Sequence, residues 1–547
     1  MLEQATPAEV VILGGGLAGL TLARQLRLAR PETRVVILER RAHPVPEAAW
    51  KVGESSVELG AHYFSEMLGL ADHIKQDHLP KLGLRFFFGA EQRETLDDGL
   101  EVGSFSFFPT PSFQLDRGRL ENHLARELAA AEGVTFLDQA KVTGFTLNED
   151  GLPHEVTFRC GDQDGRIVTR WLVDCTGRAA FLKRKLDLVE QVDHKVNAVW
   201  FRLQTETKVD DWCRGASCSN NQGNRWLSTN HLMGPGYWVW VIPLSSGSTS
   251  FGIVADPRLH RLDTYNKFDR ALAWLQQFEP LCGAEVAEHR DKLQDFLVLK
   301  NFSHGAKQVF SVDRWALSGE AGVFLDPFYS PGSDFIGVSN TFISDLVLRD
   351  LRGKSIRALA PIYEQMYQGF FKNTLVVYQD QYPLFGNARV MTVKIYWDYA
   401  VYWSLLAFVF IQGRLCDLRS YGRISDAFQQ AGALNNAMQQ FFRDWHGADA
   451  TPAPTAFLDQ EKVDLMVNLN RGLKAPLDEA AFLAKFEENK NLLFALAAQI
   501  TKRAQRRHPQ LAEACRAVTA LCDHQQVAVS DGAHPEYLAA AWPVLQL

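Results

Sequence analysis

Three glycines near the start of the chain, Gly14, Gly16 and Gly19, have the spacing that most clearly indicates a ligand site. They spell G-x-G-x-x-G between an apolar segment, residues 9–13, that predicts a strand and a segment, residues 20–28, that predicts a helix. Gly14 permits the tight turn, Gly16 lets the backbone approach a pyrophosphate, and Gly19 allows close helix packing. Because N–H groups at a helix start attract phosphate oxygens, the pattern predicts a dinucleotide site.

A carboxylate, Glu39, follows the next predicted strand, residues 34–38. A carboxylate at this spacing accepts hydrogen bonds from the ribose hydroxyls of an adenosine half. Arg40 and Arg41 leave open a 2′-phosphate, but Glu39 would repel one. The site therefore suits a dinucleotide without that phosphate.

Two further patterns join aromatic side chains to a turn that suits an anion. Trp238 and Trp240 lie two positions apart in Tyr237–Pro243, so on a strand both indoles share one face and form a wall. Such a pair also fills ordinary cores, and that alternative stays open here. Residues 324–332 (FLDPFYSPG) form a Pro- and Gly-rich loop whose exposed N–H groups suit an anion.

Four segments together resemble flavin-dependent halogenases. The first two are the W-x-W-x-I-P segment at residues 238–243 and Gly53-Glu54-Ser55-Ser56-Val57, which resembles the family's flavin-contacting G-E-[AS]-T-x. The loop 324–332 fits F-x-x-P-x-x-S-x-G at every specified position, and residues 81–86 resemble the K-x-x-[IL]-[KR]-F segment that carries the family's essential lysine, here Lys81. The resemblance covers roughly residues 8 to 345.

The resemblance implies the following chemistry. Reduced FAD and O₂ oxidise chloride or bromide to hypohalous acid, and Lys81 captures it and presents electrophilic halogen to the substrate. An ammonium whose pKa falls on burial suits that role. The halide would lie at Ser330, Pro331 and Gly332 beside the tryptophan wall. Taken without these neighbours, Lys81 would be interpreted as a solvated strand lysine.

FAD rather than NAD is favoured by three more segments. WLVDCT at residues 171–176, followed by Gly177, and the strand at 314–317, followed by Gly319 and Glu320, resemble motifs of the glutathione-reductase-like FAD fold; the usual acid at Glu320 is Asp. Residues 115–120 resemble the D-R motif of aromatic monooxygenases, with Arg117 near the pyrophosphate. The FAD contacts predicted are Gly14, Gly16, Leu17, Ala18, Gly19, Glu39, Arg40, Gly53, Glu54, Ser55, Ser56, Arg117, Gly177, Gly319, Glu320 and Pro327.

Tyr329 departs from the family's best-known branch. Tryptophan halogenases carry a Glu at this position, directed against the lysine, and its loss disfavours free tryptophan as substrate. A phenol or another electron-rich ring is already activated and does not need that Glu. A different carboxylate, such as Asp334, is an alternative that the sequence leaves open.

The amino-acid composition further restricts the class of protein and its compartment. The 547 residues are 46% hydrophobic and carry a net charge of −7, which indicates a globular protein and argues against a nucleic-acid partner. Eight scattered cysteines, of which Cys213 and Cys218 are the nearest pair, predict no zinc or other metal site and a reducing, cytoplasmic compartment. The N-terminus lacks signal-peptide features.

The longest apolar run, residues 400–411, is shorter than the roughly 20 residues that span a bilayer, so no transmembrane segment is expected. A helix over 396–411 is expected to form core or to cover a hydrophobic substrate. A helix lying on a membrane surface is the other alternative.

The predicted fold class is α/β. A FAD-binding, glutathione-reductase-like (aromatic monooxygenase-like) lobe takes residues 1–190 and 300–350. Residues 190–300 form a β-rich region that covers flavin and substrate, and residues 355–547 are helical.

The expected activity is halogenation of an electron-rich aromatic, phenolic, pyrrolic or polyketide-derived, free or attached to a carrier protein. The chain has one glycine-rich dinucleotide pattern, so FADH2 is expected from a separate NAD(P)H-dependent flavin reductase. The alternatives are a flavin monooxygenase or other oxidoreductase without halogenation, and a non-catalytic flavin- or carrier-binding protein.

Overall fold

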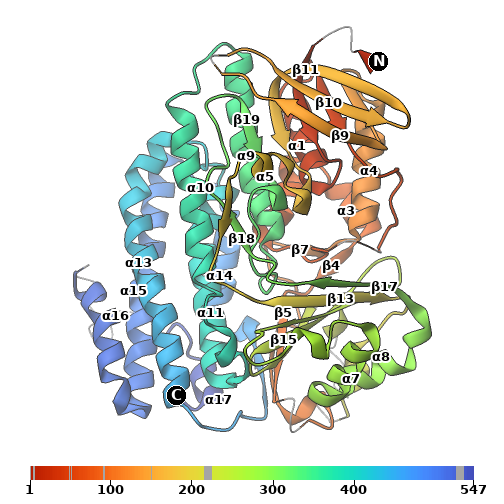
Figure 1. Cartoon of the computed structure of the whole chain (residues 1–547). Coiled ribbons are helices and arrows are strands. Elements are labelled where there is room, and N and C mark those ends of the chain that lie inside the picture. Colours follow the sequence, from red (N-terminus) through yellow and green to blue (C-terminus); the bar gives the residue numbers. More distant parts are fainter. Residues whose placement is uncertain are drawn as a thin grey trace.

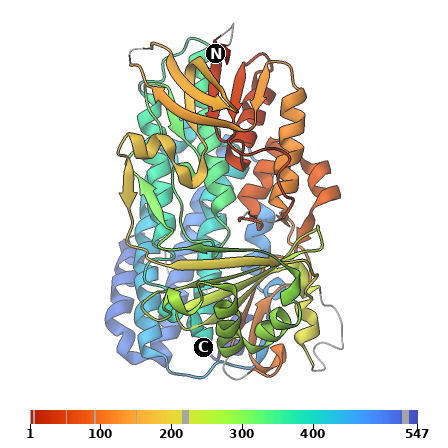
Figure 2. The ribbon, with the colours of Figure 1, turned by 45° about the vertical axis from the view of Figure 1, so that its right-hand side comes forward.

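The structure is a computed structural model that describes residues 2–3, 7–48, 50, 52–89, 93–149, 151–214, 224–524 and 535–547. Figures 1 and 2 show one sheet at one end of the molecule, a second sheet across the other half, and long C-terminal helices along one side. Cys218, half of the nearest cysteine pair, lies outside the described residues.

The first sheet supports the dinucleotide pattern. Its order is β8-β3-β2-β11-β10-β9, with β1 and β19 also paired to β11. β2 is fully apolar after Glu9 and almost wholly buried, as expected for a parallel strand covered on both faces. The strands are β1 (Leu2–Glu3), β2 (Ala8–Leu13), β3 (Val35–Leu38), β8 (Val134–Leu137), β9 (Ala140–Thr146), β10 (His154–Cys160), β11 (Gln163–Asp174) and β19 (Trp315–Leu317).

Helices α1 (Leu17–Ala29), α4 (Arg117–Ala130) and α9 (Gly332–Leu351) pack together beside this sheet, with α1 in contact with both others. Shorter helices in the same part of the chain are α2 (Glu58–His62), α3 (Ala71–Asp77) and α5 (Phe181–Lys185).

The second sheet has the order β17-β13-β16-β15-β14-β5-β6-β20. It gathers strands from three distant parts of the chain, because β5, β6 and β20 fall outside residues 190–300. Its strands are β5 (Leu84–Phe88), β6 (Leu100–Gly103), β13 (Asn197–Leu203), β14 (Thr229–Gly234), β15 (Tyr237–Pro243), β16 (Thr249–Ala255), β17 (Leu293–Leu299) and β20 (Ala456–Asp459). Two small ribbons pair β4 (Leu79–Lys81) with β7 (Ser112–Gln114), and β12 (Val189–Gln191) with β18 (His304–Ala306).

Strand β15 separates two hydrophobic cores. Val239 and Val241 point into the smaller core, which α7 (Phe268–Phe278) and α8 (Pro280–Glu288) cover. Trp238 and Trp240 point into the larger core, on the side of the first sheet. The two-residue period of a strand therefore directs both indoles to one face.

The C-terminal part is helical and packs as long neighbouring helices. Its elements are α10 (Leu359–Leu375), α11 (Ala388–Ser404), α12 (Leu406–Ile411), α13 (Leu418–Ala448), α14 (Asp464–Gly472), α15 (Glu479–Arg507), α16 (Ala512–His524) and α17 (Ala541–Leu545). The expected single helix over 396–411 is wrong at Leu405, where ψ of −92° breaks it into α11 and α12. Within the described residues, no helix is long and apolar enough to cross a membrane.

Candidate active site

A cleft of about 410 Å³ opens over the glycine turn between β2 and α1. Gly14 has φ of +104°, and a Cβ there would lie 2.4 Å from the Cys175 carbonyl oxygen. A Cβ on Gly19 would lie 2.0 Å from the Gly14 carbonyl oxygen, whereas one on Gly16 would meet nothing within 4 Å. The turn is closed on the protein side and leaves open space above Gly16.

Glu39 stands at the edge of this cleft. Its carboxylate accepts hydrogen bonds from the Gly15 amide at 2.7 Å and the Arg41 amide at 2.8 Å. These bonds fix the carboxylate beside the glycine turn, where the adenosine ribose was predicted.

Most of the predicted cofactor and halide residues line the same cleft. Those that do are Gly14, Gly16, Leu17, Ala18, Glu39, Arg40, Gly53, Glu54, Ser55, Arg117, Gly177, Gly319, Glu320, Pro327, Ser330, Pro331 and Gly332, with Trp238 and Trp240. Gly19, Ser56, Lys81 and Tyr329 do not line it. Gly19 instead packs against the turn, as its proposed role requires.

Two charged residues of the cleft are also tied to the protein. The Arg117 guanidinium donates to the Val52 carbonyl at 2.7 Å, while its buried Nε has no partner among the described residues. Glu54 accepts a hydrogen bond of 2.5 Å from Arg202, which also pairs with Asp295. The open space at Gly16, the fixed Glu39 carboxylate and the unpaired Arg117 Nε fit a dinucleotide such as FAD.

The tryptophan wall is fixed by hydrogen bonds behind it. The rings of Trp238 and Trp240 lie 5.6 Å apart between centroids. Trp238 Nε1 donates to the Tyr382 hydroxyl at 3.0 Å, and that hydroxyl donates to Asp326 at 2.6 Å. Trp240 Nε1 donates to Ser250 at 3.1 Å. Both indoles face the cleft with little freedom to turn.

Lys81 lies behind the cleft and is 3% exposed. Its ammonium donates to Ser55 Oγ at 2.8 Å and to the Ser56 carbonyl at 2.6 Å. Burial lowers the pKa of Lys81 to about 7, against the opposing effect of the Glu58 and Asp334 charges. The amine therefore changes protonation near neutral pH.

The loop residue Ser330 is connected to Lys81 through Ser55. Ser330 Oγ donates to Ser55 Oγ at 3.0 Å, and Ser55 shares a hydrogen bond of 2.7 Å with Thr229. Since both Ser330 and Lys81 donate to Ser55, the Ser55 proton points to Thr229. Ser330 also has φ of +58°, an uncommon conformation for serine that the loop imposes.

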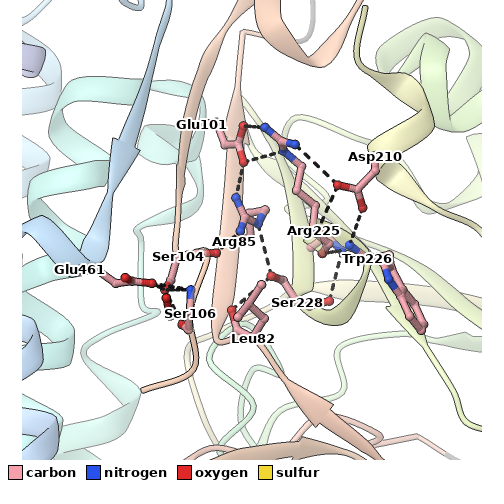
Figure 3. A network of polar contacts seen from close by, with 11 residues as sticks. Leu82, Arg85, Glu101, Ser104, Ser106, Asp210, Arg225, Trp226, Ser228 and Glu461 are labelled. Atoms are coloured by element: carbon pink, nitrogen blue, oxygen red, sulfur yellow. Dashed lines mark hydrogen bonds and ion pairs between the residues drawn. The ribbon is translucent and has the colours of Figure 1, made fainter. Parts of the chain in front are cut away.

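The backbone next to Lys81 is anchored by a buried charge network (Figure 3). Arg85 and Arg225 both bind Glu101, and Arg85 Nε donates to Ser228 Oγ at 3.2 Å. Ser228 Oγ in turn donates to the Leu82 carbonyl at 3.2 Å. The residue that follows Lys81 is thus held by the second sheet, which positions the lysine.

A second cavity of about 360 Å³ lies among α9, α10, α11, α12 and α13. Pro331 lines both cavities, so the loop 324–332, which was predicted to hold the halide, lies between them. The lining includes the exposed Gln365, Asn373 and Gln429 as well as the buried Asp334 and part of the loop. The cavity wall includes both segments that flank the break at Leu405, and their role as a cover over a hydrophobic substrate stays a prediction.

Tyr329 lines this second cavity and is bound to an acid from a distant helix. Its hydroxyl donates to Asp398 at 2.8 Å, and Asp398 also binds the buried Lys394. Gln439 donates to the other Asp398 oxygen at 2.7 Å. Burial and the Asp398 charge raise the pKa of Tyr329 well above its ordinary value, so the phenol keeps its proton.

Two acids near Lys81 complete the site, and only one was considered from the sequence. Asp334, left open as a substitute carboxylate, lines the second cavity. Glu58 was missed, although it directly follows the segment 53–57, which was predicted to contact the flavin. Burial raises the pKa of Glu58, and burial raises that of Asp334 to about 7.

Comparisons with known proteins find flavin-dependent halogenases among the relatives of this chain. Flavin-dependent halogenase chlA of Dictyostelium discoideum is 27% identical over 75% of this chain and 72% of its own length. A 1H-pyrrole-2-carbonyl-[peptidyl-carrier protein] brominase of Pseudoalteromonas luteoviolacea is 23% identical over 69% of this chain and 86% of its length. The crystal structure of halogenase PltM with phloroglucinol and FAD shares the fold, with a TM-score of 0.57, 17% identity, and 95% and 96% of the two chains covered.

The glycine turn, the fixed acid and the long cleft define a dinucleotide-binding flavoprotein. A family model described as FAD binding domain matches residues 7–289. The chain belongs to this FAD-binding family and, with its halogenase relatives, to the flavin-dependent halogenases.

Proposed function

We propose that the protein is a FADH2-dependent halogenase that uses O₂ and chloride or bromide to halogenate a neutral, electron-rich aromatic. The observation that carries the proposal is the buried Lys81, which lines neither cavity but bonds to the cleft residue Ser55. Two acids, Glu58 and Asp334, influence its charge, and Asp334 lines the second cavity. Reduced FAD, when bound, supplies with O₂ the oxidising equivalents that convert halide to hypohalous acid.

In this proposal the chain's own residues bind the cofactor and the halide, position the oxidant and restrict the substrate. The glycine turn, Glu39 and Arg117 hold the dinucleotide, and the loop at Ser330 holds the halide. Lys81 donates a hydrogen bond to hypohalous acid and presents it to the ring. The tryptophan wall keeps a bulky substrate away from the flavin side. With one glycine-rich turn for a dinucleotide, the protein takes FADH2 from a separate NAD(P)H-dependent reductase.

The second cavity supports a neutral phenolic or polyketide-derived ring. Its ionisable lining consists of two acids, Asp334 and Asp398, and five tyrosines; Asp398 is already paired with Lys394, so an anionic substrate meets the Asp334 carboxylate and no cation of the lining. The relatives that act on pyrrole-2-carbonyl carrier proteins leave carrier attachment as part of the proposal. A tethered ring would enter beside the exposed lining residues Gln365, Asn373 and Gln429.

Charge selectivity tests this substrate class. With FADH2, air and bromide, we expect resorcinol to be brominated with a kcat/KM at least ~10²-fold above that of 3,5-dihydroxybenzoate, because like-charge contacts cost several kcal/mol. Product is measured by mass spectrometry. Equal turnover of the carboxylate would exclude the neutral substrate class, and hydroxylated product formed without halide would instead indicate a monooxygenase.

A further inference from the structure

Asp334 is a buried acid that faces the second cavity and is held in place by two donors. It lies in the first turn of α9 and is 2% exposed. Its Oδ1 accepts from the Gly60 amide at 2.9 Å, and its Oδ2 accepts from the Tyr402 hydroxyl at 2.8 Å. Each oxygen keeps a further lone pair, so the carboxylate has capacity to accept a proton from a molecule in the cavity.

One short segment connects Asp334 with Lys81. Lys81 binds Ser55 and Ser56, and four residues beyond Ser56 the Gly60 amide binds Asp334. A Cβ on Gly60 would lie 2.6 Å from the Ser333 side chain, so this segment and the start of α9 are in tight contact. Ammonium and carboxylate are thus both hydrogen-bonded to the same short segment, residues 55–60.

Charge balance makes the two groups exchange protons easily. Two buried acids, Glu58 and Asp334, accompany one buried ammonium, so ionising all three leaves a net negative charge out of water. Burial raises the pKa of Asp334 to about 7 and lowers that of Lys81 to about 7. Proton transfer between groups of matched pKa is close to balanced in free energy.

Glu58 contributes to the charge balance around Lys81 but does not contact the aromatic ring of a substrate in the second cavity. Its carboxylate accepts from Trp403 Nε1 at 3.0 Å and from Asn470 Nδ2 at 3.5 Å. It does not line the second cavity, whereas Asp334 does. Of the two acids, Asp334 is the one that a substrate can contact.

We propose that Asp334 accepts the proton that the aromatic ring loses on halogenation and returns it to Lys81. This inference rests on the proposed function, which supplies hypohalous acid as the oxidant. The carbon–halogen bond forms as the oxygen–halogen bond breaks, and the departing hydroxide takes a proton from the Lys81 ammonium to leave as water. The ring proton passes to Asp334 and then, through that water, to the Lys81 amine. Ring and hypohalous acid become halogenated ring and water.

This transfer of the ring proton to Asp334 and then to Lys81, here called the relay, predicts a bell-shaped pH dependence of kcat centred near neutral pH. The rising limb follows ionisation of Asp334 and the falling limb follows deprotonation of Lys81, with macroscopic values that belong to the coupled pair. The titratable groups that face Asp334 are Glu58, Lys81, Tyr402 and Tyr378. The Tyr402 hydrogen bond lowers the pKa of Asp334, so Tyr402→Phe moves the rising limb to higher pH.

Asp334→Asn is the direct test. We use FADH2, air, bromide and ring-deuterated phenol or resorcinol, whichever the wild type brominates faster. The variant is expected to lose roughly 10²-fold in kcat, to lose the rising limb, and to gain a primary isotope effect on product formation, because ring deprotonation becomes rate-limiting. Tyr402→Phe keeps the carboxylate and is the matched control, expected to shift the limb without that isotope effect.

The outcomes separate the two proposals. FADH2 oxidation and trapping of released hypohalous acid by free methionine report on folding and on the earlier steps, and both are expected to persist in Asp334→Asn. An unchanged rate and isotope effect in Asp334→Asn would overturn the relay while leaving halogenation intact. If the wild type brominates neither phenol nor resorcinol, this result contradicts both the proposed function and the relay.

Discussion

Replacement of Lys81 by alanine is expected to lower formation of halogenated product by at least ~10²-fold, the scale of losing one positioned hydrogen-bond donor. Oxidation of FADH2 under air and release of hypohalous acid are expected to continue, because Lys81 does not line the dinucleotide cleft. Without the ammonium, the donor that presents the oxidant to the ring beside Asp334 is lost. Mass spectrometry of the product and trapping of hypohalous acid by free methionine measure the two steps separately.

Two further variants make the Lys81 result specific. Lys81→Met keeps most of the side-chain volume and removes the charge, so it is expected to match Lys81→Ala if the amine does the chemistry. Lys485→Ala, which removes a partly exposed lysine paired with Glu488 on α15, is expected to behave as the wild type. Halogenation that survives in Lys81→Met would remove the lysine from the mechanism.

The sequence predicted best where the determinants are local. β15 matches its predicted bounds, and β2 and β3 lie within one residue of theirs, since buried apolar runs between turns define strands. The glycine turn was equally clear because its spacing is local: close contacts exclude a side chain at Gly14 and Gly19, whereas Gly16 faces open space. The break at Leu405 was missed, because the surrounding residues suit a helix and neither Pro nor Gly marks the position.

The parts of the site that depend on residues far apart in the sequence could not be predicted from the sequence. Asp398 binds Tyr329 from 69 positions away, and Trp403 binds Glu58 from 345 positions away. Glu54 matched a flavin-contacting motif, yet its carboxylate is also an ion-pair partner of Arg202. Such pairs arise only when the helices close over the sheets, so periodicity and motifs cannot supply them. The roles given to the individual site residues remain predictions that the variants test.

The domain boundaries also remain a prediction. The second sheet combines β5 and β6 with β20, which comes from the helical part of the chain. A boundary drawn along the sequence therefore cuts through one hydrogen-bonded sheet. This pairing ties the segment that follows Lys81 to the region that forms the second cavity.

Gly16→Val is expected to weaken binding of oxidised FAD by about 10²-fold, or ~2.7 kcal/mol, within the range of forced overpacking. Gly16 has φ of −88°, which any residue adopts, and a Cβ there meets no protein atom within 4 Å. The free protein therefore tolerates valine, and the branched side chain fills only the space that a pyrophosphate would occupy. Calorimetric titration with FAD gives the affinity, and thermal unfolding of the flavin-free protein gives the stability.

Gly19→Val is the matched control, because its Cβ would lie 2.0 Å from the Gly14 carbonyl oxygen inside the protein itself. That variant should unfold at a clearly lower temperature even without FAD, whereas Gly16→Val should not. The contrast separates a glycine required by the fold from one required by the ligand. If Gly16→Val binds FAD as the wild type does, the pyrophosphate does not lie against this turn, and the orientation of the flavin toward Lys81 would have to be assigned anew.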